Sequence, residues 1–102
     1  MRILLCCGAG WSSSFLVQKM RKAIKTNKLE NVYCEAVPFS TIGEVCEDFD
    51  IICLGPHYRD ELEEVAEKCE KYGTKAIVIP DNIYGMLDAE ALLNLCKEKV
   101  EQ

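Results

Sequence analysis

The sequence has few of the features that mark membrane, secreted or metal-binding proteins. Its longest apolar runs have four to six residues, far short of the roughly 20 that span a bilayer. The N-terminus lacks the long uninterrupted apolar region of a signal peptide, and we therefore expect a cytosolic protein. The single histidine, His57, is not clustered with thiols, and no two cysteines have Cys-x-x-Cys spacing. We therefore expect neither a metal site nor a cofactor.

Basic residues are also scarce relative to acidic ones. The chain has 12 Lys and Arg against 17 Asp and Glu, a formal net charge of −5. Because affinity for nucleic acid comes largely from Lys and Arg at phosphates, we expect a protein or small-molecule partner instead. The length of 102 residues and the 49% hydrophobic content favour one compact domain over residues 1–102.

The seven cysteines do not indicate a disulfide framework. Their number is odd and no export signal precedes them. Most are expected to be reduced residues of the core, because they fall inside apolar periodic segments, as do Cys34, Cys53, Cys69 and Cys96.

Hydrophobic patterning predicts strands that alternate with helices. Val32–Val37 carries Glu35 and is followed by Pro38, which are tolerated best on an edge strand. The other apolar runs are typical of buried strands. The expected strands are residues 2–6, 32–37, 50–54 and 75–79; the expected helices are residues 12 to about 28, a short helix capped by Ser40 that ends at Val45, residues 58–72 stopped by Gly73, and a last helix capped by Asp88 after an irregular segment 80–85.

This alternation requires crossover connections, so the sheet should be parallel with right-handed units. The sequence therefore predicts an α/β fold: an open four-stranded parallel sheet with helices on both faces, a three-layer sandwich. Ligands of such sheets bind beyond the carboxyl ends of the strands, near the point where the strand order reverses. Cys7 falls at that edge.

The segment from Cys7 to Ser14 is the most informative part of the chain. After an apolar strand it places a thiol, two glycines that flank Ala9, and three hydroxyls before a helix; its residues are Cys7, Gly8, Ala9, Gly10, Trp11, Ser12, Ser13 and Ser14. Small residues let backbone N–H groups approach an anion, and a helix N-terminus adds unpaired donors and the positive dipole end. A thiol at this position is expected to have a lowered pKa. The pattern predicts phosphoryl transfer through Cys7, with residues 8–14 binding the phosphoryl group.

Two other readings of the loop are weaker but stay open. A low-molecular-weight cysteine phosphatase or an arsenate-reductase-like enzyme would carry Arg six residues after the nucleophile, where this chain has Ser13. A thiol redox switch would use the adjacent Cys6 and Cys7, although neighbouring cysteines form a strained disulfide. Cys6 points to the other face of the strand and is expected to be a packing residue.

Other polar residues near the strand ends are expected to have ordinary roles. His57 is expected to be a solvated loop residue, and Tyr84 to pack over the sheet edge. No guanidinium and no carboxylate lie in the loop itself, so a carboxylate could come only from other strand ends, at Asp60 or Asp81. Without an Arg clamp or a base for water, a thiophosphate is expected to pass to an acceptor and not to be hydrolysed quickly.

Three motifs together resemble the IIB component, lactose/cellobiose/chitobiose type, of the bacterial phosphoenolpyruvate-dependent sugar phosphotransferase system. The likeness covers essentially the whole chain. The family's phosphocysteine loop, Cys-x-x-Gly-x-Ser-[Ser/Thr]-Ser, appears as residues 7–14, its Leu-Gly-Pro as 54–56, and its Tyr-Gly-x-x-Asp as 84–88. Gly8 often stands as Ser in members, and Trp11 is bulkier than the usual apolar residue.

The resemblance implies a four-stranded parallel sheet and a phosphocarrier. Cys7 would accept a phosphoryl group from a phosphohistidine of the IIA protein and pass it to a sugar held by the membrane-embedded IIC transporter. The sugar is expected to be a β-linked disaccharide, although its identity belongs to IIC. We expect transient complexes with IIA and IIC, and a monomer between them.

Overall fold

The computed structural model describes residues 1–7 and 11–101; for Cys7 and residues 11–14 it describes the backbone only. Four strands and five α-helices alternate along the described chain, with 3₁₀ turns (η) between some of them. In chain order these are β1 (Arg2–Cys7), α1 (Trp11–Thr26), β2 (Tyr33–Pro38), η1 (Phe39–Thr41), α2 (Ile42–Val45), η2 (Cys46–Asp48), β3 (Ile51–Leu54), η3 (Pro56–Glu61), α3 (Leu62–Glu70), β4 (Lys75–Val78), α4 (Asp81–Met86) and α5 (Ala89–Val100).

The strands form one parallel sheet in the order β2-β1-β3-β4. The predicted α/β fold with a four-stranded parallel sheet is therefore confirmed. Strands β1 and β3 lie in the middle, and the described side chains of β3 are buried throughout. Strand β2 is at one edge, as Glu35 and Pro38 indicated, because an edge strand tolerates a charge and a missing N–H donor.

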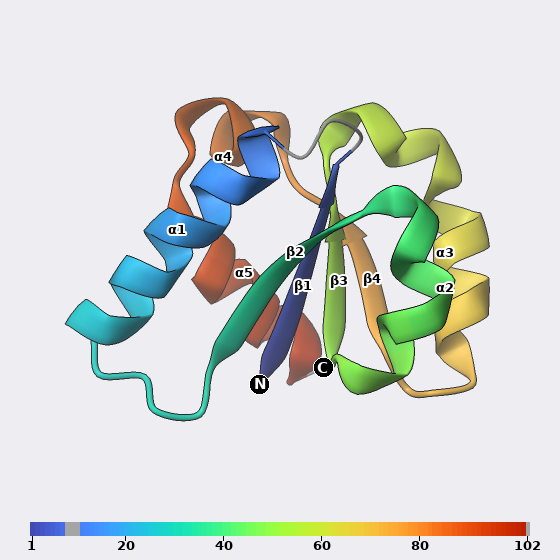
Figure 1. The fold of residues 1–102 in the computed structure, drawn as a ribbon, viewed down its shortest axis with the longest axis horizontal. Helices are drawn as coiled ribbons and strands as arrows, with labels where there is room; N and C mark the ends of the chain where they lie inside the picture. The colour runs from blue at the N-terminus through green and yellow to red at the C-terminus, as the bar shows by residue number, and fades with distance from the viewer. Residues whose placement is uncertain (8–10, 102) are drawn as a thin grey trace.

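Helices cover both faces of the sheet (Figure 1). Alternate residues of β1 separate the two cores: Ile3 and Leu5 pack with α1 and α5, whereas Leu4 and Cys6 pack with α2 and α3. This alternation is the period of two that a strand imposes on its side chains. The three-layer arrangement follows from burying both faces of a central parallel strand.

Two helix ends confirm signals read from the sequence. Gly73 adopts φ +73° after α3, and the amide of Thr74 donates to the carbonyl of Cys69 at 3.2 Å, the pattern of a glycine-terminated helix. Asp88 caps α5, with its Oδ1 accepting from the Ala91 amide at 3.1 Å.

Helix α1 ends earlier than expected, at Thr26. Lys28 takes a left-handed conformation, φ +54°, and the amide of Leu29 donates to the carbonyl of Ile24 at 2.9 Å. This is a Schellman ending without glycine, which the residue types do not signal.

Three other local expectations are wrong. Ser40 caps no helix: it lies inside η1, and α2 begins after Thr41 with no side-chain cap. The segment 58–72 is not one helix, because η3 precedes α3. Residues 81–86 are helical and not irregular, since Pro80 supplies a suitable φ before the first turn and accepts from the Tyr84 amide at 3.0 Å.

Candidate functional site

The end of β1 lies where the strand order reverses. Through α1 the chain passes from β1 to β2 on one side, and then through α2 to β3 on the other side of β1. Cys7 is the last residue of β1 and pairs with Pro38 of β2; on the other side of β1 the Gly55 amide, just after β3, donates to the Cys6 carbonyl at 2.9 Å. The backbone thus places Cys7 at the switch point of the sheet, where α/β proteins bind ligands.

Helix α1 begins four residues after Cys7. Its first turn is Trp11–Ser14, whose amides have no partners one turn earlier in the helix. The first turn contains no acidic residue, and the last contains Lys25, so the turn itself adds no carboxylate that would repel an anion at the positive end of the helix dipole. The predicted ligands Gly8, Ala9 and Gly10, and the side chains of Cys7, Trp11, Ser12, Ser13 and Ser14, lie outside the described residues.

Cys6 is a packing residue, as expected. It is 1% exposed and belongs to the core beneath α2 and α3, on the face opposite Ile3 and Leu5. Cys7 is the next residue along β1.

The remaining cysteines are buried and poorly suited to nucleophilic chemistry. Burial raises the pKa of Cys34, and it raises the pKa of Cys69 to about 12. A hydrogen bond with Cys96, whose Sγ lies 3.4 Å away, raises the pKa of Cys53 well above its ordinary value. Because the thiolate is the reactive form, burial and a raised pKa make Cys34, Cys53 and Cys69 poor nucleophiles at neutral pH.

Aromatic rings join the segments that follow three strands. Phe39, after β2, stacks on Tyr58, after β3, with ring centroids 4.4 Å apart. His57 is exposed, and its ring lies 4.5 Å from that of Tyr58 and 6.3 Å from that of Tyr84 on α4. His57 is thus exposed, as expected, and its ring also lies beside two tyrosine rings; Tyr84 is partly buried against the core.

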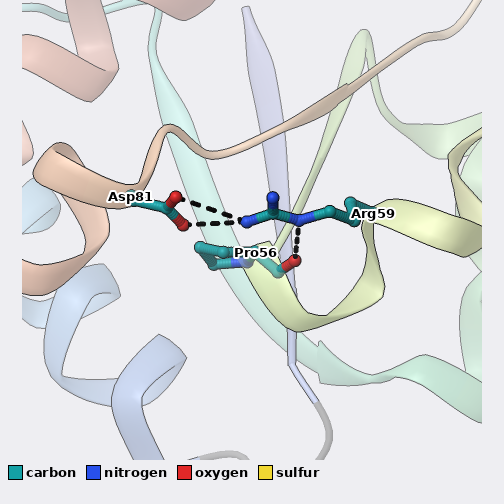
Figure 2. Close-up of polar contacts among 3 residues, drawn as sticks. All are labelled: Pro56, Arg59 and Asp81. Carbon is teal, nitrogen blue, oxygen red and sulfur yellow. Dashed lines mark hydrogen bonds and ion pairs between the residues drawn. The ribbon is translucent and has the colours of Figure 1, made fainter.

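Arg59 and Asp81 form an ion pair at the same end of the sheet (Figure 2). Arg59 Nη2 lies 3.0 Å and 3.3 Å from the two carboxylate oxygens of Asp81, and Arg59 Nε donates to the Pro56 carbonyl at 3.0 Å. The sequence indicates Asp81 as a carboxylate at a strand end near the loop, but it does not indicate Arg59 as its partner. The one signal for Arg59 is its position, three residues after Pro56, which follows β3.

The described part of the chain contains no group of three or more His, Cys, Asp and Glu side chains arranged to hold a metal ion. No helix among the described residues is long and apolar enough to cross a membrane.

The fold is an α/β sandwich in which β1 ends at Cys7, at the switch point of a parallel sheet. The sequence pattern of the lactose/cellobiose-specific IIB subunits of the phosphotransferase system (PTS) matches residues 2–95. The chain belongs to this family and is therefore a PTS IIB component, a phosphotransferase and phosphocarrier of sugar transport.

Relatives of known description agree with this assignment. The chain is 34% identical over 95 residues to the galactose-specific EIIB component of Lactococcus lactis subsp. cremoris. The match covers 89% of this chain and 88% of the relative. The same figures hold for the cellobiose-specific EIIB component of Lactococcus lactis subsp. lactis. The solution structure of the cellobiose-specific IIB component of Borrelia burgdorferi superposes with a TM-score of 0.79, at 34% identity, covering 99% of this chain and 92% of that one.

Proposed function

We propose that Cys7 is the phosphoryl carrier of this IIB component. It would receive the group from a phosphohistidine of a IIA protein and pass it to a sugar held by a membrane IIC transporter. The backbone amides of residues 8–14 and the hydroxyls of Ser12, Ser13 and Ser14 would bind the phosphoryl oxygens. The observation that carries the proposal is the position of Cys7, which ends a central strand at the switch point, four residues before a helix begins.

In the first step the Cys7 thiolate attacks phosphorus. The P–S bond forms as the P–N bond of the phosphohistidine breaks, and the electron pair of that bond returns to the imidazole nitrogen. The start of α1 favours both the thiolate and the charge on the transferred group, because its amides and dipole are fixed in place before the reaction.

In the second step a sugar hydroxyl attacks phosphorus. The P–O bond forms, the P–S bond breaks with its electrons returning to Cys7 as thiolate, and the hydroxyl proton passes to a base supplied with the sugar by the acceptor. Positioning and fixed dipoles supply most of the catalysis in such transfers, so neither step calls for a metal or a cofactor of the carrier.

The sugar is not set by the family assignment. Two relatives with the same identity to this chain are described as specific for galactose and for cellobiose. We propose a β-linked disaccharide, bound by IIC and not by this chain. The carrier would act as a monomer at the cytoplasmic side of the membrane, where the IIC site receives phosphoryl groups.

A reconstituted relay tests this function. The chain is incubated with phosphoenolpyruvate, the general phosphotransferase proteins and a set of IIA proteins, and its intact mass is measured. We expect the chain to gain the mass of one phosphoryl group. Cys7→Ser should not gain it, and Cys6→Ala, a change at the adjacent buried thiol, should gain it as the original chain does.

A second arm tests the acceptor. The phosphorylated chain is mixed with membranes that contain an IIC transporter and with candidate sugars. Transfer to a sugar supports the relay, whereas release of inorganic phosphate in the absence of IIC would support a phosphatase. A phosphoryl group that persists in Cys7→Ser would refute the assignment of the carrier residue.

A further inference from the structure

The Arg59–Asp81 pair connects two segments that leave the same edge of the sheet. Arg59 lies in η3, which follows β3, and Asp81 is the first residue of α4, which comes after β4. Figure 1 shows the segment after β3, the start of α1 and α4 at one end of the sheet. Arg2 and Arg21, the other arginines of the chain, lie at the start of β1 and within α1.

Backbone contacts tie the Arg59 guanidinium to the neighbourhood of Cys7. Leu54 is paired with Cys6, and the next residue, Gly55, donates to the Cys6 carbonyl at 2.9 Å. The carbonyl that accepts from Arg59 Nε belongs to Pro56, one residue further along. The Arg59 guanidinium is therefore held by residues 55–56, the segment that lies beside the end of β1.

Breaking the Arg59–Asp81 ion pair should cost little free energy. Its side chains are 58% and 74% exposed, and exposed ion pairs contribute little to stability. One terminal nitrogen, Nη2, makes both contacts with Asp81, and Figure 2 shows the other without a contact to the residues drawn. A phosphoryl group carries up to two negative charges and three acceptor oxygens, so it competes strongly with a single carboxylate for an arginine.

We propose that Arg59 binds the phosphoryl group on Cys7 and that Asp81 holds Arg59 when Cys7 is unmodified. This inference rests on the proposed function of Cys7. Phosphorylation exchanges one anion for another at the guanidinium: Arg59 turns from Asp81 to the phosphoryl oxygens, and returns to Asp81 after the group has left. The loop after Cys7 lacks the fixed arginine of a phosphatase, and Arg59 supplies a reversible substitute in which Asp81 favours release of the group to the acceptor.

Rates of transfer test the exchange. Arg59→Gln is expected to slow phosphorylation of Cys7 by about 10-fold to 100-fold, the loss of one charge-assisted hydrogen bond, and Arg59→Lys to restore part of the rate. Asp81→Asn is expected to accept the phosphoryl group at least as fast as the unmodified sequence and to donate it several times more slowly, because no carboxylate then competes for Arg59.

Lys68→Gln is the matched control. Lys68 pairs with Glu64 at 3.4 Å on α3, with side-chain exposures of 58% and 67% that resemble those of the Arg59 pair. We expect both its rates to equal those of the unmodified sequence.

Nuclear magnetic resonance follows the exchange directly. In the chain without substitutions, the resonances of the Arg59 side-chain Nε–H and of the Asp81 carboxyl carbon should shift together when Cys7 is phosphorylated. The resonance of the Glu64 carboxyl carbon should not shift. If Arg59→Gln is phosphorylated and donates at unchanged rates, or if the Arg59 signal does not move in a phosphorylated chain, the exchange is refuted while the function of Cys7 stands. If the unmodified chain takes no phosphoryl group from any donor, the proposed function is refuted and the exchange with it.

Discussion

Replacement of Asp88 separates a structural role from a chemical one in the motif formed by residues 84–88. Its carboxylate oxygen Oδ1 accepts from the Ala91 amide at 3.1 Å at the start of α5, and the residue is exposed. Loss of such a cap by Asp88→Ala costs about 1 kcal/mol, within a range of about 0.5–2 kcal/mol. Loss of the negative charge beside the helix N-terminus adds about 0.3–1 kcal/mol. We therefore expect a loss of roughly 1–2 kcal/mol in the free energy of unfolding.

Asp88→Asn isolates the two contributions. The asparagine side chain keeps an acceptor for the Ala91 amide and loses only the charge, so we expect a loss of about 0.3–1 kcal/mol. Urea denaturation followed by circular dichroism measures both values. In thermal unfolding each kcal/mol corresponds to a decrease in Tm of about 4–8 °C for a domain near this size.

The phosphorylation assay supplies the second half of this test. Because the Asp88 contact is local to α5, both variants should still be phosphorylated at unchanged rates when folded. Equal stability of Asp88→Ala and the unmodified chain would refute the capping role. A folded Asp88→Ala chain that takes no phosphoryl group would show that the residue acts in the chemistry or in partner binding.

Four further predictions follow from the packing of the core and the helices. Thr74→Val should lower the free energy of unfolding by about 1–3 kcal/mol, because the buried Thr74 hydroxyl lies 3.0 Å and 2.8 Å from the carbonyl oxygens of Cys46 and Phe49; Thr74→Ser is the control, and equal losses in the two variants would contradict this reason. Gly85→Ala should raise stability by about 0.4–1 kcal/mol, since a Cβ at Gly85 in α4 meets no atom within 4 Å; destabilisation in urea would show that space is lacking. The free energy of unfolding should fall as the pH rises above about 9, because the unfolded chain then releases thiol protons that Cys34, Cys53 and Cys69 retain when folded. Cys69 retains its proton until about pH 12. A urea midpoint that does not change between pH 9 and 11 would contradict these shifts. Iodoacetamide at neutral pH should modify Cys7 within the time that leaves Cys34, Cys53 and Cys69 unmodified, and should modify all seven cysteines after unfolding; rapid loss of the Cys69 thiol in the folded chain would contradict the burial argument.

The sheet could be predicted from the sequence because its signals are local. Apolar runs of four to six residues bounded by turn residues mark the strands, Glu35 and Pro38 mark an edge, and Gly73 and Asp88 mark helix ends. Each of these depends on residues close together in the chain, where backbone preferences and capping act.

The errors arise where tertiary contacts decide. Residues 80–85 read as irregular because they combine proline, aspartate and glycine, yet Ile83 and Tyr84 pack on the core and hold residues 81–86 as α4. Packing of this kind overrides weak local propensity. The Arg59–Asp81 pair joins residues that are 22 positions apart, so no spacing rule within one element could indicate it.

For the candidate site, the structure confirms the predicted order of a strand that ends at Cys7 and a helix that begins a few residues later. Cys7 stands at the end of β1 and α1 begins at Trp11, close to the predicted start of the helix at Ser12. The chemistry assigned to residues 7–14 stays a prediction, because it depends on how amides and hydroxyls converge on one anion.

The measurement that tests the account most directly is localisation of the phosphoryl group in the unmodified chain. The chain is phosphorylated by its IIA donor, cleaved under conditions that preserve phosphocysteine, and sequenced by tandem mass spectrometry. We predict that the group is found on the sulfur of Cys7. Its presence on His57, on a serine of residues 12–14 or on Cys6 would contradict the account.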